Sequence, residues 1–178
     1  MRTAALLFLG AALVLQSACG GSEPVQPPEF THHDDSSWLN SAPLTLASLR
    51  GKVVLVEFWA FDCVNCRASL PWVESLGASR TGAGLVVIAV HTPELPQERS
   101  AGNVRDAVRR LDIRYPVMLD GDYSYWNAMH NQYWPAFYVI GRDGLIHGHA
   151  IGEMHVGEDR ARRLESLIDQ QLGSPSAT

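Results

Sequence analysis

The sequence predicts an α/β fold in which a mixed central sheet is flanked by helices. Val53–Trp59 and Leu85–His91 are runs of β-branched, aliphatic and aromatic residues with almost no polar side chains, which is typical of strands buried on both faces. A helical stretch connects the two runs, so the strands should be parallel. The chain then closes with two more strands and an amphipathic helix over residues 158–172. This order of elements predicts the mixed sheet.

The elements of the first half follow from turn residues and periodicity. Residues 44–49, followed by Arg50-Gly51-Lys52, predict a small strand and a turn ahead of the first buried strand. A helix is expected over residues 66–76, with a kink at Pro71, because proline cannot donate a backbone hydrogen bond. A second helix is expected around residues 103–111, where the apolar side chains share one stripe.

The pattern of the second half of the sequence predicts shorter helices and strands. Residues 115–119 have the composition of a short strand, and residues 124–130 that of a short helix. Ala136–Ile140 and residues 145–151 are expected to form a hairpin, because Gly141-Arg142-Asp143-Gly144 between them is rich in turn residues.

Residues 1–18 are interpreted as a signal peptide. Arg2 supplies the positive start, and the apolar run that follows is too short to cross a bilayer comfortably. The sequence around Cys19 resembles a bacterial lipobox, in which the cysteine is lipidated, although Gln16 stands where an aliphatic residue is usual. Ordinary signal cleavage nearby is the alternative.

The mature chain is divided into a tether, one domain and a tail. Residues 19–37 are rich in Gly, Pro, Ser and Glu without apolar periodicity, so we expect a flexible tether in which His32 and His33 are solvated. Residues 38–172 form a domain of ordinary size, and residues 173–178 form a polar tail.

The composition excludes several classes of protein. With 46% hydrophobic residues the chain can bury a core, and three cysteines are too few for a disulfide scaffold. The net charge of −5, without a basic run, offers no surface for nucleic acid. An odd number of cysteines in an exported protein leaves one unpaired thiol to explain.

The motif Cys63-Val64-Asn65-Cys66 lies between a buried strand and the helix that follows it. A helix N-terminus presents unpaired N–H groups and a partial positive charge, which stabilise a thiolate. Cys63, at the exposed lip, is therefore the expected nucleophile, and Cys66 is the expected resolving cysteine. A structural disulfide and half of a zinc site are the alternatives, but no second Cys-x-x-Cys exists and no metal is expected.

This region resembles the active site of the thioredoxin superfamily, and within it the TlpA-like branch and its DipZ-like domains. The resemblance extends over residues 38–172 and implies a thioredoxin-like fold with a TlpA-type αβ insertion. It rests on these stretches: Phe58-Trp59-Ala60, Cys63-Val64-Asn65-Cys66, Pro71, LVVIAVHTPE at 85–94, Asn103-Val104-Arg105, and 127–135, which ends in NQYWP.

Three further residues acquire roles through the resemblance. Pro135 matches the cis-proline that faces the dithiol and binds substrate backbone, with an ordinary trans proline as the alternative. Trp134 is expected to shape the substrate groove. Glu57 matches the buried acid beneath the second cysteine, so its pKa should rise and it should transfer the proton of Cys66. A partly exposed strand residue is the alternative for Glu57.

Asp62 and His91 flank the expected site. A carboxylate at Asp62 would oppose thiolate formation at Cys63 and could tune the potential or the choice of partner. His91 ends a strand on the expected active-site side, so contact with substrate and a hydrogen-bonded structural role are both open.

The expected function is that of a membrane-tethered, extracytoplasmic thiol–disulfide oxidoreductase, more often a reductant in this branch. Its expected partners are exported proteins with disulfides or thiols, a membrane electron donor, and the membrane itself through the lipid anchor. The Cys63–Cys66 pair carries the electrons, so no cofactor is expected, and we expect a monomer. Two alternatives are a peroxiredoxin-like peroxidase, whose motif would need Pro and Thr at Val56 and Ala60, and a Sco-like metal chaperone, whose cysteines are one residue further apart.

Overall fold

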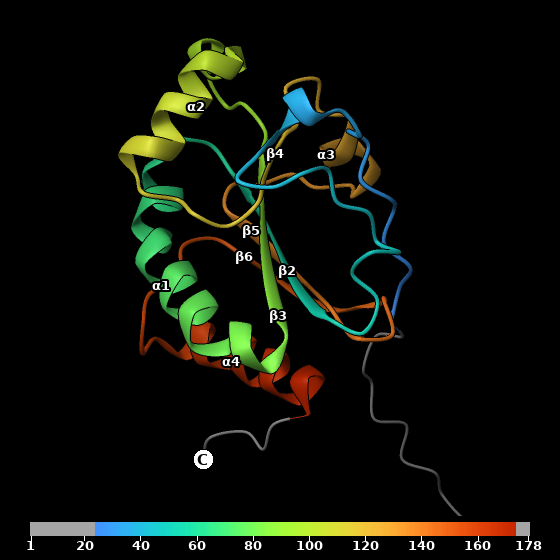
Figure 1. Ribbon diagram of the computed structural model, residues 1–178. Helices are drawn as coiled ribbons and strands as arrows, with labels where there is room; N and C mark the ends of the chain where they lie inside the picture. The colour runs from blue at the N-terminus through green and yellow to red at the C-terminus, as the bar shows by residue number, and fades with distance from the viewer. Residues whose placement is uncertain (1–23, 174–178) are drawn as a thin grey trace, which may run out of the picture.

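The computed structural model describes residues 24–173, which form a six-stranded mixed sheet with helices on both faces (Figure 1). The strand order is β1-β4-β3-β2-β5-β6, with β2, β3 and β4 parallel and the remaining pairs antiparallel. The strands are β1 (Trp38–Leu39), β2 (Val53–Trp59), β3 (Leu85–His91), β4 (Val117–Leu119), β5 (Ala136–Ile140) and β6 (Ile146–Ile151). The predicted α/β class and the parallel central strands are confirmed.

The central strand β2 is buried on both faces of the sheet. All seven residues of β2 are buried, and their side chains alternate between the two faces. Val54, Val56 and Phe58 pack into one core cluster, whereas Val53, Leu55 and Trp59 pack into the clusters on the other face. Burial on both faces requires the nearly continuous apolar run seen in the sequence.

In the described part of the chain, three helices cover the face of the sheet to which the Trp59 side chain belongs (Figure 1). They are α1 (Val64–Arg80), α2 (Ala101–Arg110) and α4 (Asp159–Leu172). The opposite face is covered by α3 (Ser124–Ala128) and the N-terminal segment. Short 3-10 turns are η1 (Asp35–Ser37), η2 (Thr81–Ala83) and η3 (Pro96–Arg99). Within residues 24–173, no helix is long and apolar enough to cross a membrane.

Two local predictions in the first half were wrong. Residues 44–49 form turns and no strand, because Thr45 and Ser48 exchange side-chain and backbone hydrogen bonds that compete with a sheet ladder. The helix after the cysteines is longer than residues 66–76: α1 continues through Pro71 to Arg80. Pro71 therefore neither ends nor divides this helix.

The predicted tether was also wrong for residues 24–37, which lie against the domain. Val25 forms a β-bridge with Ile146, and Phe30 is fully buried between Trp38 and Tyr125. The aromatic contacts of Phe30 explain why this polar segment does not extend into solvent, since a buried phenylalanine is a large gain for folding. The signal peptide (1–18), Cys19 and residues 174–178 lie outside the described part of the chain.

Candidate active site

Cys63 and Cys66 form a disulfide at the N-terminus of α1, with their Cα atoms 5.3 Å apart. Cys63 is the N-cap residue of this helix, and its Sγ accepts the backbone N–H of Cys66 at 3.2 Å. The first turn of α1 contains no acidic residue, so the helix dipole is not neutralised there. Reduction of the pair would leave the Cys63 sulfur in a position that stabilises a thiolate. This is the nucleophile position that the sequence predicts.

The exposure of the two cysteines differs in the sense that exchange chemistry requires. Cys63 retains 9% exposure and Cys66 is fully buried. Cys63 is thus less open than the expected lip, and the neighbouring Val64, at 68% exposure, forms the outermost part of the motif. An incoming disulfide can reach Cys63 ahead of Cys66, which fits the order of attack and resolution.

Pro135 lies directly before β5, and the Trp134–Pro135 peptide bond is cis. β5 pairs with β2, with Ala136 opposite Phe58, so the proline reaches the end of the sheet from which α1 begins. The indole N–H of Trp134 donates to the carbonyl of Thr92 at 3.0 Å, and its ring packs against the core cluster that contains both cysteines. The structure therefore brings the dithiol, the cis-proline and the tryptophan together.

Glu57 is fully buried in the middle of β2, so it is not a partly exposed strand residue. Desolvation raises its pKa to about 8, against a smaller opposing effect of the Tyr115 hydroxyl. Tyr115 donates to Glu57 Oε2 at 3.5 Å, and Glu57 Oε1 has no hydrogen-bond partner among the described residues. By strand alternation Glu57 shares its face with Leu55 and Trp59, which is the face that α1 covers.

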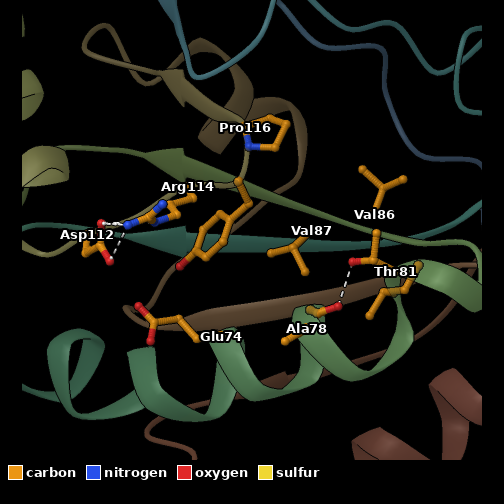
Figure 2. Close-up of a pocket in the computed structure, with 11 residues that line it drawn as sticks. Glu74, Ala78, Thr81, Val86, Val87, Asp112, Arg114 and Pro116 are labelled. Atoms are coloured by element: carbon orange, nitrogen blue, oxygen red, sulfur yellow. Dashed lines mark hydrogen bonds and ion pairs between the residues drawn. The ribbon is translucent and has the colours of Figure 1, made fainter.

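Tyr115 also lines a cavity of about 540 Å³ between α1 and β3 (Figure 2). The apolar floor of this cavity includes Leu85 and Val87, and exposed charged side chains, Glu74 among them, stand at its rim. The cavity lies on the same face of the sheet as Glu57. Sequence reasoning did not single out Tyr115, because nothing local indicates that it touches a residue fifty-eight positions away.

His91 is 1% exposed, and desolvation lowers its pKa to about 4. Its ring stacks on Phe61 with centroids 5.6 Å apart and meets Trp59 edge-on. Its Nε2 has no partner among the described residues. His91 is thus a buried histidine, kept neutral by desolvation and packed among aromatic rings of the core cluster that contains both cysteines.

Asp62 turns its carboxylate to a neighbouring segment: its Oδ2 accepts from Gln97 Nε2 at 2.9 Å. Its backbone N–H donates to Glu98 Oε1 at 2.8 Å. Asp62 is therefore tied to η3 through both its backbone and its side chain.

Glu98 is a residue of the site that sequence reasoning missed. Although it is 1% exposed, its carboxylate accepts N–H bonds from Asp62, Glu94 and Leu95 at 2.7–2.8 Å. The available signal was Leu95-Pro96-Gln97-Glu98, in which Pro begins a helical turn and Glu occupies the capping-box position. Glu98 holds the segment after β3 against the residue that precedes Cys63.

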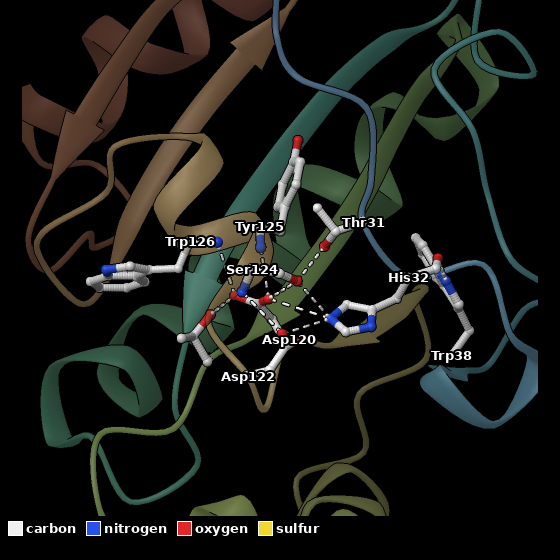
Figure 3. Close-up of polar contacts among 9 residues, drawn as sticks. Thr31, His32, Trp38, Asp120, Asp122, Ser124, Tyr125 and Trp126 are labelled. Atoms are coloured by element: carbon white, nitrogen blue, oxygen red, sulfur yellow. Dashed lines mark hydrogen bonds and ion pairs between the residues drawn. The ribbon is translucent and has the colours of Figure 1, made fainter.

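A second polar cluster joins the N-terminal segment to α3 (Figure 3). His32 Nε2 lies 3.2 Å from Asp122 Oδ1 and 3.5 Å from Asp120 Oδ1. Asp120 is buried and already accepts the backbone N–H groups of Tyr125 and Trp126 at 2.9 and 3.0 Å. His32 is thus part of a structural clamp, not the solvated residue that the tether prediction implied.

Comparison with known proteins agrees with this arrangement. The Redoxin family model matches residues 25–167. Protein DipZ of Mycobacterium tuberculosis is 40% identical over 150 residues, which cover 80% of this chain but only 22% of that protein. The thiol-disulfide oxidoreductase YkuV of Bacillus subtilis is 30% identical over 139 residues, 77% of this chain and 92% of that protein.

Solved structures show the same fold. A thioredoxin-like protein in its oxidised form has a TM-score of 0.70 at 27% identity and covers 84% of this chain and 96% of its own. A thiol:disulfide interchange protein from Chlorobium tepidum has a TM-score of 0.61 at 22% identity, covering 85% and 99%. From the family match, the fold and the cysteine pair, the chain belongs to the redoxin family of the thioredoxin-like superfamily.

Proposed function

We propose that this chain works outside the cytoplasm as a membrane-tethered reductant of disulfides in exported proteins. The chain is a thiol–disulfide oxidoreductase of the thioredoxin-like type. One observation carries the proposal: the Cys63–Cys66 disulfide caps α1 at the end of the sheet where the cis Pro135 leads into β5, on the fold shared by these relatives. Because the chain covers 22% of DipZ, the activity of that whole protein is not transferred to it.

The reaction follows from the geometry of the two sulfurs. In the reduced protein the Cys63 thiolate attacks one sulfur of a substrate disulfide, and the other substrate sulfur leaves as a thiolate and takes a proton from water. Cys66 then loses its proton and attacks Cys63 Sγ, which releases the second substrate thiol. Two electrons pass to the substrate, and the Cys63–Cys66 disulfide is restored. The exchange itself needs no other redox group.

Glu57 is the proposed acceptor for the proton of Cys66. A carboxylate can take a proton efficiently when its pKa lies near the working pH, and burial raises the pKa of Glu57 to about 8. Glu57 faces the side of β2 that α1 covers, and Cys66 belongs to the core cluster on that side. Glu57 would release this proton before it accepts the next one.

The substrate is proposed to bind as an extended segment beside Pro135. A cis-proline at a strand start leaves neighbouring backbone groups free for pairing with another chain. Trp134 is proposed as one wall of this groove, where it is fixed by the bond to Thr92 and by stacking on Trp126 with centroids 4.1 Å apart. His91 is not proposed to contact substrate, because it is buried between rings.

The tether is proposed to start from a lipidated Cys19, after removal of a signal peptide at residues 1–18. Residues 19–23 could extend at most roughly 18 Å. Val25 joins Ile146, which pairs with Ile140 and through it with Val54, at the start of β2. The cysteines follow the other end of β2, roughly 17 Å further along the strand. This arrangement would direct the active site away from the membrane and toward exported substrates, and a membrane protein is the proposed electron donor.

The purified Cys63→Ser variant tests the assignment. We expect it to reduce a model protein disulfide no faster than buffer, whereas Cys66→Ala should accumulate a covalent mixed disulfide with the substrate. A Cys19→Ser variant is the matched control, because it should exchange thiols normally and lose only its place in the membrane fraction. Wild-type exchange by Cys63→Ser would overturn the proposal.

The direction of electron flow is tested by the reduction potential of the Cys63–Cys66 pair. A reductant should lie nearer the thioredoxin value of about −270 mV than the oxidant value of about −120 mV. A potential at the oxidising end would replace the proposed reductase with an oxidase. Consumption of peroxide at a rate comparable to thiol exchange would instead favour a peroxidase.

A further inference from the structure

The carboxyl of Glu57 has a single hydrogen-bond partner among the described residues, and that partner, Tyr115, is partly exposed at the protein surface. Tyr115 donates to Glu57 Oε2 at 3.5 Å, while Glu57 Oε1 has none. Tyr115 itself is only partly buried and packs against two core clusters, the one that contains Cys66 and the one that contains Leu55. Tyr115 therefore lies at the boundary, called here the seam, between the core cluster that contains the cysteine pair and the neighbouring cluster on the same face of the sheet.

The cavity of about 540 Å³ brings solvent to this seam. Glu74 on α1 and Asp112 and Arg114 before β4 are exposed and stand at its rim, as Figure 2 shows. Asp112 and Arg114 pair with each other, at 3.1 Å between Asp112 Oδ1 and Arg114 Nε. Glu74 is the acidic group at the rim whose charge contributes to the raised pKa of Tyr115.

The remaining neighbours of Glu57 offer no exit for a proton. In the sheet Glu57 lies opposite Ala89 on β3 and Phe137 on β5, and both are apolar. Among the buried side chains of α1 other than Cys66, Leu70 and Val73 are apolar. The polar groups of the other buried side chains are already bonded elsewhere: the Ser69 hydroxyl donates to the carbonyl of Asn65 and accepts the N–H of Met154, and the Trp72 indole donates to Glu165. A carboxyl that takes a proton in each cycle must nevertheless release it to water.

We propose that Tyr115 carries the proton between Glu57 and water in the cavity, and so sets how fast Glu57 is recharged. This inference rests on the proposed role of Glu57 in thiol exchange. In the step, the Glu57 carboxyl gives its proton to the Tyr115 oxygen while the phenol gives its own proton to a water molecule. Tyr115 stays neutral, no electrons move, and Glu57 is left as a carboxylate.

The electrostatics agree with a relay through the neutral phenol. Burial and the charges of Glu57 and Glu74 hold the pKa of Tyr115 well above its ordinary value. A phenolate would therefore be costly, and transfer must be concerted. Tyr115 acts through Glu57 and is a positioning residue rather than a catalytic one.

The test is Tyr115→Phe, which keeps the ring and removes the hydroxyl. We expect resolution of the mixed disulfide by Cys66 to slow by about tenfold or more near pH 7, within the range of general acid–base effects. Small buffer bases such as formate or neutral imidazole, which can enter the cavity and accept the proton, should restore the rate in this variant and leave the wild type unaffected. Rescue that depends on buffer concentration would not follow from a merely structural role.

Two further variants complete the test. Thr81→Val is the matched control, because it removes a hydroxyl that lines the same cavity but bonds the carbonyl of Gly77. It should show the wild-type rate and no rescue. Ala78→Phe, on the exposed side of the cavity, should narrow the entrance and slow resolution without altering Tyr115, which keeps the test valid if Tyr115→Phe folds poorly.

The outcomes separate the relay from the proposed function. If Glu57→Gln slows resolution but Tyr115→Phe and Ala78→Phe keep the wild-type rate at every buffer concentration, the relay is wrong and Glu57 keeps its role. If Glu57→Gln itself resolves at the wild-type rate across pH 6–9, the proton role of Glu57 fails and the relay fails with it. Unchanged exchange in Cys63→Ser would overturn the oxidoreductase assignment instead.

Discussion

Glu98 accepts the backbone N–H of Asp62 at 2.8 Å, and this bond links the residue before Cys63 to a turn thirty-six positions later in the chain. The second oxygen of the same carboxylate accepts the N–H groups of Glu94 and Leu95. A buried carboxylate is tolerated when it is hydrogen-bonded in this way, and bonds to a charged acceptor are stronger than neutral ones. The Glu98 carboxylate thus fixes the residue before Cys63 to the turn after β3 through bonds to backbone N–H groups.

We expect Glu98→Ala to lower the free energy of unfolding by about 2–4 kcal/mol, because three backbone N–H donors lose a buried, charged acceptor. Urea unfolding of the oxidised protein measures this loss. The rate at which Cys63 attacks a model disulfide should also fall, since the backbone before it is released. Glu94→Ala, on the exposed side of the same turn, is the control and should change the stability by no more than about 0.5 kcal/mol.

The buried Glu57 makes stability depend on pH between about 4.5 and 8. Its pKa of about 8 in the folded protein exceeds the ordinary value of 4.5, so the unfolded chain releases this proton earlier. Between pH 4.5 and 8 the folded state binds more protons, and Glu57 therefore lowers stability by up to about 1.4 kcal/mol per pH unit as the pH rises. Relative to wild type, Glu57→Gln should gain stability steadily from pH 5 to 8. A constant difference between the two proteins over this range would contradict the buried, protonated carboxyl.

Burial of His91 affects the pH dependence of stability in the opposite sense to Glu57, at pH values below 6.5. Its pKa of about 4 in the folded protein lies below the ordinary 6.5, so the unfolded chain takes up a proton first as the pH falls. Stability due to neutral His91 is complete above pH 6.5 and is lost between 6.5 and 4, which opposes the contribution of Glu57 between 4.5 and 6.5. We expect His91→Phe to match the wild type near pH 7.5 and to gain stability over it as the pH falls to 5. Urea titrations at several pH values check this, and equal pH dependence in both proteins would refute it.

Phe30 attaches the N-terminal segment to the core. It is fully buried against Tyr125, with ring centroids 5.1 Å apart. We expect Phe30→Ala to cost about 3–5 kcal/mol, as for other buried phenylalanines. Val25→Ala is the control, because Val25 is 62% exposed, and its effect should stay within about 0.5 kcal/mol. If Phe30→Ala unfolds at the wild-type urea concentration, residues 24–37 are not part of the folded domain.

The sequence by itself determined the elements whose pattern is local. β2 and β3 are continuous apolar runs, and the motif from Cys63 to Cys66 begins a helix directly after one of them, so strand, turn and dithiol could be predicted together. The cis peptide before Pro135 also agreed with the prediction, through the resemblance of its neighbours to a family. Helix lengths were predicted less well, because the ends of α1 depend on packing beyond its first turns.

Only the tertiary structure decided which distant residues share the site. Tyr115 meets Glu57 across fifty-eight positions and Glu98 meets Asp62 across thirty-six, and no periodicity in the sequence encodes such pairs. The burial of Phe30 is of the same kind, since a phenylalanine in a polar segment looks exposed until the face that receives it is known. Local pattern reflects the backbone conformation of neighbouring residues, whereas burial and hydrogen bonding depend on where the chain returns in space.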